Sequence, residues 1–136
     1  MAKFVLKDAV VSINGVDLSQ WGSAASLEIE VEDQDATTFT SQGWSEVLGG
    51  LKSATLGLTF KQDFDAAAVD ATLWPIVGEV VPFSVKAKSG ATSATNPAYT
   101  GNVLIAAYSP VAGEVGNIAE MEVEFPTSGA ITRATA

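Results

Sequence analysis

The stretch ASLEIEVE, residues 25–32, alternates apolar and acidic residues almost without a break. Successive side chains of a strand lie on opposite faces, so a period of two places all the apolar residues on one side and all the acidic residues on the other. The acidic residues of this stretch are Glu28, Glu30 and Glu32. The pattern predicts a strand with one face for a core and one acidic face.

A second stretch, AEMEVEF at residues 119–125, repeats the pattern with Glu120, Glu122 and Glu124. Residues two apart lie ~6.8 Å apart on one face of a strand, so each stretch forms a row of like charges, which we call an acidic comb. The simplest interpretation is a solvated outer face. Glutamate is depleted in strands, however, and neighbouring carboxylates repel, so a surface whose electric field has a role is the alternative.

The composition excludes several classes of function. The chain has 136 residues and a net charge of −9, with no histidine and no cysteine. Imidazole acid–base catalysis, thiol chemistry, disulfides and the usual zinc sites are therefore excluded. So acidic a domain is unsuited to nucleic acids and to anionic membranes, and a flat comb does not wrap a cation as a loop does. We expect no enzyme, no catalytic or metal-binding residues and no cofactor.

Strands dominate the rest of the pattern. Asn14-Gly15, the commonest two-residue hairpin turn, separates two short β-rich runs. A helix is expected over residues 65–74, because acidic residues precede an alanine-rich segment and Pro75 follows it; Trp74 is expected to cap the core. The predicted strands cover residues 9–13, 16–18, 25–32, 52–61, 80–88, 99–108 and 119–125. The predicted fold is mainly β, an antiparallel β-sandwich or partly closed barrel with one flanking α-helix, as a single domain over residues 1–136.

Several segments together resemble a known family. Residues 43–56 read GWSEVLGGLKSATL, and the chain also contains QDF at 62–64, LWP at 73–75, NPAYTG at 96–101 and PTSG at 126–129. These segments, with the length, the acidity and the order of strands and helix, resemble the major tail tube proteins of long-tailed bacteriophages, of the siphophage type. The resemblance extends over residues 11–133.

The resemblance implies a structural virion protein. Tail tube proteins form rings, typically hexameric, which stack into a hollow tube around a tape measure protein; a tail terminator is a further partner. The tube later conducts DNA, and inner sheets of neighbouring subunits join around its lumen. A lumen lined by the two combs would repel phosphates, so DNA would pass without binding. The resemblance places the chain in the tail of a virion, assembled in the host cytoplasm.

The family's long loop contacts the next ring, and the matching segment here is residues 33–43. The residues assigned to this inter-ring contact are Asp33, Asp35, Thr37, Thr38, Phe39, Thr40 and Trp44. An N-terminal arm at residues 1–8 and a flexible C-terminal tail at residues 131–136 are expected to order on assembly.

Two alternatives stay open. The first is a related tube or shell component: the inner tube of a contractile tail, a part of a gene-transfer particle or a capsid decoration protein. The second is a monomeric β-sandwich binding module, for which an exposed aromatic platform would be expected.

Overall fold

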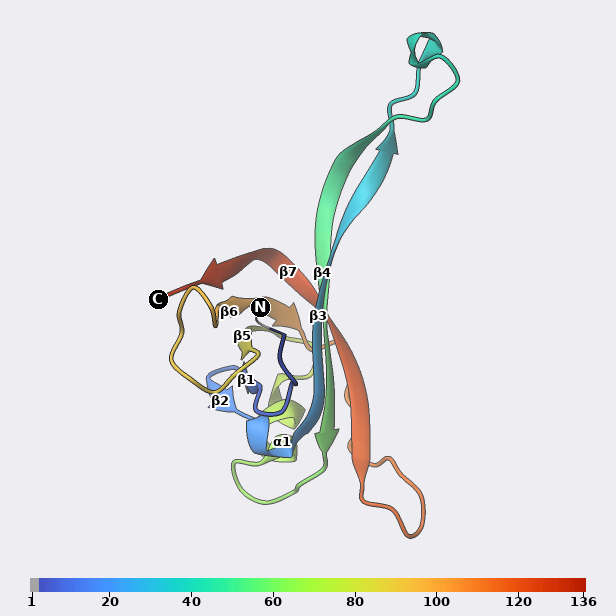
Figure 1. Cartoon of the computed structure of the whole chain (residues 1–136). Helices are drawn as coiled ribbons and strands as arrows, with labels where there is room; N and C mark the ends of the chain where they lie inside the picture. The colour runs from blue at the N-terminus through green and yellow to red at the C-terminus, as the bar shows by residue number, and fades with distance from the viewer. Residues whose placement is uncertain (1–2) are drawn as a thin grey trace.

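The computed structural model describes residues 3–136, and these form one bent antiparallel sheet of seven strands with a single short α-helix (Figure 1). The strand order is β2-β1-β5-β6-β7-β4-β3. The strands are β1 (Val10–Ile13), β2 (Val16–Asp17), β3 (Gly22–Asp35), β4 (Val47–Lys61), β5 (Val80–Lys86), β6 (Ala98–Leu104) and β7 (Glu120–Ala134). The helix is α1 (Val69–Leu73), and short 3-10 turns lie at Ser19–Trp21, Phe39–Ser41 and Trp74–Ile76.

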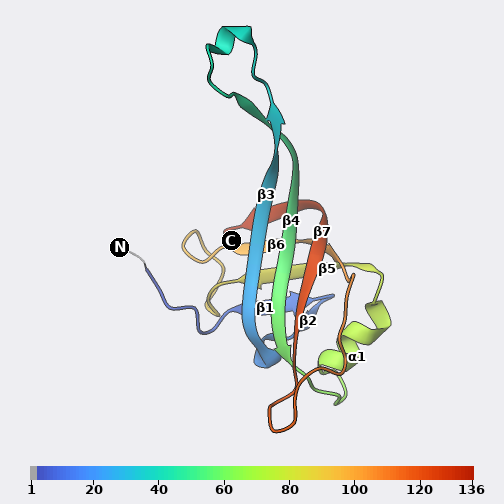
Figure 2. The same cartoon turned by 90° about the vertical axis from the view of Figure 1, so that its right-hand side faces the viewer.

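Strand β7 joins two halves of the sheet that face each other. Its first part, Glu120–Pro126, pairs with β4, and its last part, from Thr127 to Ala134, pairs with β6. In Figure 2 the β3-β4-β7 half runs upward across the other half behind it. Within residues 3–136, β2 and β3 stand at the two ends of the strand order, so the sheet does not close into a barrel. The predicted class, antiparallel β with one flanking helix, is confirmed.

The core lies between the two halves. Leu56, Phe60 and Phe125 of one half and Ile13 and Val103 of the other are fully buried. Val69 and Leu73 of α1 are buried as well, so the helix closes one end of the core. In the turn between β1 and β2, Asn14 and Gly15 both have positive φ, as the two-residue hairpin predicted from this pair requires.

The helix is shorter than the sequence suggested. The expected span was 65–74, but α1 covers Val69–Leu73 and a 3-10 turn follows it. Ala67 has a φ of +64° and Ala68 is extended, so the helix cannot begin before residue 69. Trp74, expected to cap the core, is 65% exposed.

Strand β7 is longer than expected. The predicted strand ended at Phe125, and residues 131–136 were expected to be a flexible tail. The strand instead continues to Ala134, because its last part takes β6 as a new partner after the bend. Met1 and Ala2 of the expected N-terminal arm lie outside the described residues. From Lys3 onward, no helix has the length and apolar character needed to cross a membrane.

Candidate functional site: an acidic sheet face and a protruding arm

The two acidic combs lie on one face of the β3-β4-β7 half. Residues directly opposite each other in neighbouring strands share a face. Strand β4 pairs with both β3 and β7, so its residues show whether the two combs lie on the same face. Its Thr55 stands opposite Glu28, while its Gly57 stands opposite Glu124. Since Thr55 and Gly57 are two residues apart, both combs face the same way. All six glutamates are exposed. The opposite face packs against the core in β4 from Ala54 onward and in β7 from Met121 to Phe125. In β3, however, Ile29 and Val31 are 53% and 48% exposed, so the core does not extend behind the whole β3 comb.

The combs are staggered along the sheet. Glu124 lies at the level of Ser26, and Glu28 lies at the level of Pro126. The β7 comb therefore ends about where the β3 comb begins, and the two form a diagonal band. Strand β4 contributes the small side chains of Thr55 and Thr59 to this face, and Gly57 contributes none. This arrangement limits the contact between the two rows of like charge.

Repulsion remains at the junction of the combs. The carboxyl group of Glu30, through a hydrogen bond and its charge, raises the pKa of Glu28 above its ordinary value, and the charge of Glu124 adds to the effect. At the other end of the band, Glu120 pairs with Lys61, which lowers the pKa of Glu120. The net field of this face is therefore negative, with its only ion pair among the described residues at one end.

The second feature is an arm, residues 31–51, formed by the far ends of β3 and β4 and the loop between them. Figure 1 shows it extending well beyond the body. Its exposed large apolar side chains are Val31, Phe39, Trp44, Val47, Leu48 and Leu51. Glu32 lies at a register shift between β3 and β4, at the base of the arm, and accepts a hydrogen bond of 2.6 Å from Gln34 Nε2.

Hydrogen bonds organise the tip of the arm. The Thr37 hydroxyl accepts from the amide of Glu46 at 2.9 Å, and the amide of Thr37 donates to Asp35 Oδ1 at 3.0 Å. This second bond lowers the pKa of Asp35. The amide of Thr38 donates to Ser41 Oγ, and Thr38 and Thr40 share a hydroxyl contact of 3.0 Å. Polar bonds therefore hold the turn while Phe39 and Trp44 face solvent.

The structure brings together most of the residues assigned to the inter-ring loop. Asp33, Asp35, Thr37, Thr38, Phe39 and Trp44 line one shallow concavity at the tip, and Thr40 lies in the 3-10 turn beside it. Asp33 and Asp35 belong to β3 rather than to the loop, which covers residues 36–46. The sequence reasoning missed Val47, Leu48 and Leu51. The apolar residues in VLGGL, residues 47–51, could have indicated them, because this segment directly precedes the strand predicted from residue 52.

Two strand edges beside the acidic face are unpaired within the described chain. Strand β3 pairs with β4 alone, and Glu120–Phe125 of β7 also pairs with β4 alone. The three-stranded acidic sheet thus offers an edge on each side to which another strand can add. Across residues 3–136, no group of three or more acidic side chains is placed to hold a metal ion.

Comparisons with known proteins agree with this fold. No family model matches the chain, and no curated protein matches it in sequence. Several chains of solved structures match in fold, among them two at 24% sequence identity. A chain of the "virion of native gene transfer agent (GTA) particle" aligns with a TM-score of 0.75, covering 94% of this chain and 96% of that one.

The second structure is the "tail of empty GTA particle", refined with C6 symmetry. Its chain aligns with a TM-score of 0.67 and covers 85% of this chain and 83% of that one. At this level of identity the two matches define the class of fold, a bent antiparallel sheet that this chain shares with a chain of a gene transfer agent virion and a chain of a gene transfer agent tail.

Proposed function

We propose that this chain is the subunit of a tail tube, a structural and non-enzymatic protein that assembles into stacked rings. The observation that carries the proposal is the acidic face. Both combs lie on one exposed sheet face of a fold that is also found in a particle's tail. In such a ring this face turns toward the lumen, and the six glutamates of each subunit line it.

The lumen role follows from electrostatics. Affinity for nucleic acid comes largely from cations that neutralise phosphates, and this face has one lysine, which is already paired with Glu120. A closed ring of carboxylates repels a polyanion from all sides, over a distance of ~8 Å at physiological ionic strength. DNA therefore passes through without adhering to the wall.

The arm is the proposed contact between rings. It continues the direction of β3 and β4 beyond the body (Figure 1), and in the proposed tube this direction leads toward the next ring. Exposed Phe39, Trp44 and Leu51 give it an apolar surface that a body from the next ring can cover. Its tip is shaped by hydrogen bonds of Asp35, Thr37, Thr38 and Thr40. Asp33 lies in the same concavity and adds a polar side chain.

The partners follow from this role. Each subunit contacts its own copies within and between rings, while a tape measure protein occupies the lumen before DNA does and a tail terminator closes one end. The site of action is the tail of a virion, and assembly takes place in the host cytoplasm. The comparison structures make the tail of a gene-transfer particle the second candidate, with the same tube role.

Electron microscopy of the purified protein at high concentration tests the assembly. We expect rings or tubes without any cofactor, and a strictly monomeric protein in every preparation would contradict the proposal.

A Glu→Lys series over both combs tests whether they line the lumen. We expect tubes to form, since exposed substitutions usually cost no more than about 0.5 kcal/mol each, while DNA delivery by the complete particle fails. Unchanged delivery after reversal of both combs would show that they do not line the lumen.

A further inference from the structure

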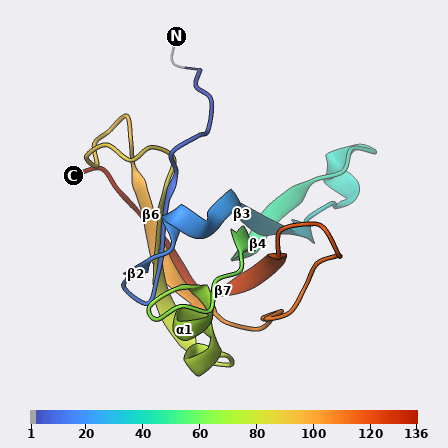
Figure 3. The ribbon, with the colours of Figure 1, turned by 90° about the horizontal axis from the view of Figure 1, so that it is seen from below.

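The two lateral sides of the molecule differ in charge. With the acidic face toward the viewer in Figure 2, the N-terminal segment leaves the body on the left and α1 lies on the right. Figure 3, seen from below, also places these two segments at opposite ends. Strand β5 connects the two sides, since Glu79 precedes it next to α1 and Lys88 follows its other end.

The first side, which we call the basic side, consists of residues 3–7 and Lys88. Lys3 and Lys7 are exposed, and Phe4 between them is 53% exposed. The Lys88 ammonium lies 5.0 Å from the centre of the Phe4 ring. Ser89 Oγ donates to Asp8 Oδ2 at 2.8 Å, which holds the segment against the loop after β5. Two lysines thus flank three apolar residues in one exposed segment.

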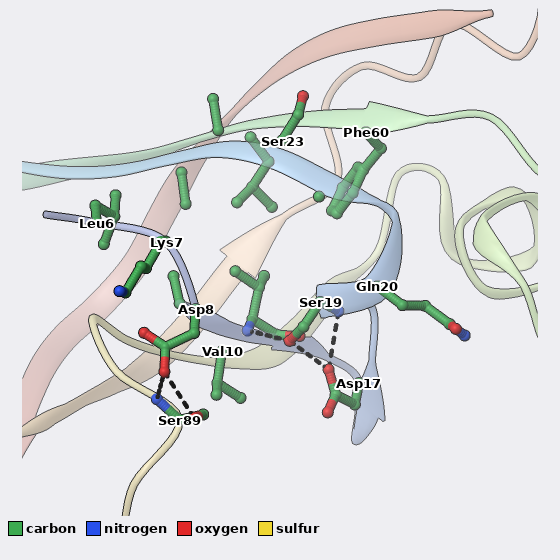
Figure 4. Close-up of a pocket in the computed structure, with 16 residues that line it drawn as sticks. Leu6, Lys7, Asp8, Val10, Asp17, Ser19, Gln20, Ser23, Phe60 and Ser89 are labelled. Carbon is green, nitrogen blue, oxygen red and sulfur yellow. Dashed lines mark hydrogen bonds between the residues drawn. The ribbon is translucent and has the colours of Figure 1, made fainter. Parts of the chain in front are cut away.

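A cavity of about 490 Å³ adjoins this side, between the N-terminal segment and β3. Figure 4 shows Leu6, Val10 and Phe60 around it, with the Asp8–Ser89 contact at one rim. Ala24 and Ala25 of the unpaired edge of β3 also line it. Serine side chains and the carboxylates of Asp8 and Asp17 line the rest of it. The cavity therefore offers an apolar wall near Leu6, next to the exposed lysines, in a recess whose lining is mixed.

The second side, which we call the acidic side, is the segment from residue 62 to residue 80 around α1. This segment contains four acidic residues and no lysine or arginine. Asp63 accepts from Trp21 Nε1 and Asp70 accepts from the Tyr108 hydroxyl, so these two are engaged within the chain. Asp65 and Glu79 are exposed, and the same segment carries the exposed rings of Phe64 and Trp74.

We propose that the basic side of one copy binds the acidic side of the next copy, and that this contact closes the ring. Lys3 and Lys7 face Asp65 and Glu79 of the neighbour, and Trp74 fills the recess beside Leu6. The inference rests on the proposed tube function and adds the lateral interface to it. The partner is a second copy because the complementary charges lie on opposite flanks of one chain.

The geometry also selects a ring over a two-fold dimer. A two-fold contact would bring each side against itself, basic against basic or acidic against acidic, and like charges facing each other disfavour it. A head-to-tail contact joins unlike sides. When this head-to-tail contact is repeated by rotation about one axis, every acidic face stays turned toward that axis. The same rotation brings the unpaired edge of β3 toward the Glu120–Phe125 edge of the neighbour.

Charge reversal tests the interface. K3E/K7E and D65K/E79K should each lower ring and tube formation at least tenfold, as measured by sedimentation and electron microscopy. The quadruple variant, with all four substitutions, restores unlike charges across the contact at the wild-type net charge of −9 and should assemble again. Mixing the two double variants should also restore rings in which the two copies alternate.

Trp74→Ala tests the apolar part of the same contact. It should lower assembly at least tenfold with an unchanged melting temperature.

The outcomes separate this inference from the function it rests on. If wild-type protein forms tubes and both double variants do so equally well, the lateral interface is wrong and the tube function stands. Failure of the quadruple variant to assemble, although it is folded by circular dichroism, would also overturn the pairing. If wild-type protein forms neither rings nor tubes, the tube function itself fails.

Discussion

The two ends of the β3–β4 hairpin both carry large apolar side chains but have different surroundings. In the body, Leu56, Leu58 and Phe60 of β4 are buried against the other half of the sheet. In the arm, Leu48 and Leu51 of the same strand are exposed, Leu51 at 81%. The hairpin is continuous, but the second layer that covers it in the body is missing in the arm (Figure 1).

The difference shows where the chain's own core ends. An isolated two-stranded hairpin is marginally stable at best in water, and it becomes stable when a third strand or another layer covers its apolar face. The body provides that layer up to about Ala54, the first buried residue of β4. Beyond this point the large apolar side chains of β4 are exposed, and in the tube proposed above a neighbouring subunit would cover them.

The largest expected effect comes from breaking the arm at its tip. Deletion of residues 37–40 removes the Thr37 contacts with Glu46 and the exposed Phe39 ring. We expect the body to stay folded, since its core lies far along the hairpin, and tube growth to be abolished. Electron microscopy and light scattering measure the growth, and the thermal transition measures the folding.

The control for this deletion is Phe39→Ala, which keeps the length and the hydrogen bonds of the loop. We expect it to slow growth without abolishing it, because Trp44 and Leu51 remain. Unchanged polymerisation of the deletion variant would show that the arm does not carry the contact between rings.

The next effect compares one residue from each end of β4. Phe60→Ala should lower the free energy of unfolding by about 3–5 kcal/mol, because it leaves a cavity in the core where Phe60 is fully buried. Leu51→Ala should change it by no more than about 0.5 kcal/mol, because that side chain is mostly in water. Urea denaturation of the unassembled subunit measures both. Equal losses would mean that the arm has packing partners within its own chain.

Local patterns predicted the acidic face and the fold class well. The alternation in residues 25–32 and 119–125 has a period that only a strand satisfies, and it therefore placed all six glutamates on exposed strand faces. That both combs share one sheet depends on the pairing of β4 with β3 and with β7, a long-range arrangement that no local pattern contains.

The features that the sequence did not predict depend on long-range packing. Strand β7 continues past Pro126 and Gly129 because β6 lies there to pair with it. The helix begins late because Ala67 adopts a left-handed conformation, which no local signal indicates for alanine. Trp74 is a typical core residue by type, yet its position after α1 turns it outward.

The smallest expected effect lies within the acidic face, where Glu30 raises the pKa of Glu28 first through a hydrogen bond and then through its charge, and the charge of Glu124 adds less. Glu30→Gln should therefore lower the pKa of Glu28 toward its ordinary value, and Glu124→Gln should lower it by less. Carbon-detected NMR titration of the Glu28 carboxyl group in the unassembled subunit measures both shifts.

The sign of the pH dependence follows from the same repulsion. A carboxyl group whose pKa is raised in the folded state takes up its proton there at a higher pH than in the unfolded chain. The repulsion between ionised Glu28 and Glu30 thus opposes folding at neutral pH. As the pH falls through the raised pKa of Glu28, protonated Glu28 can share a hydrogen bond with Glu30, and the repulsion is relieved. Glu30→Gln should remove this part of the pH dependence. A pKa of Glu28 that does not change in Glu30→Gln would show that the two carboxyl groups point apart in solution, and the staggered band would then consist of independent charges.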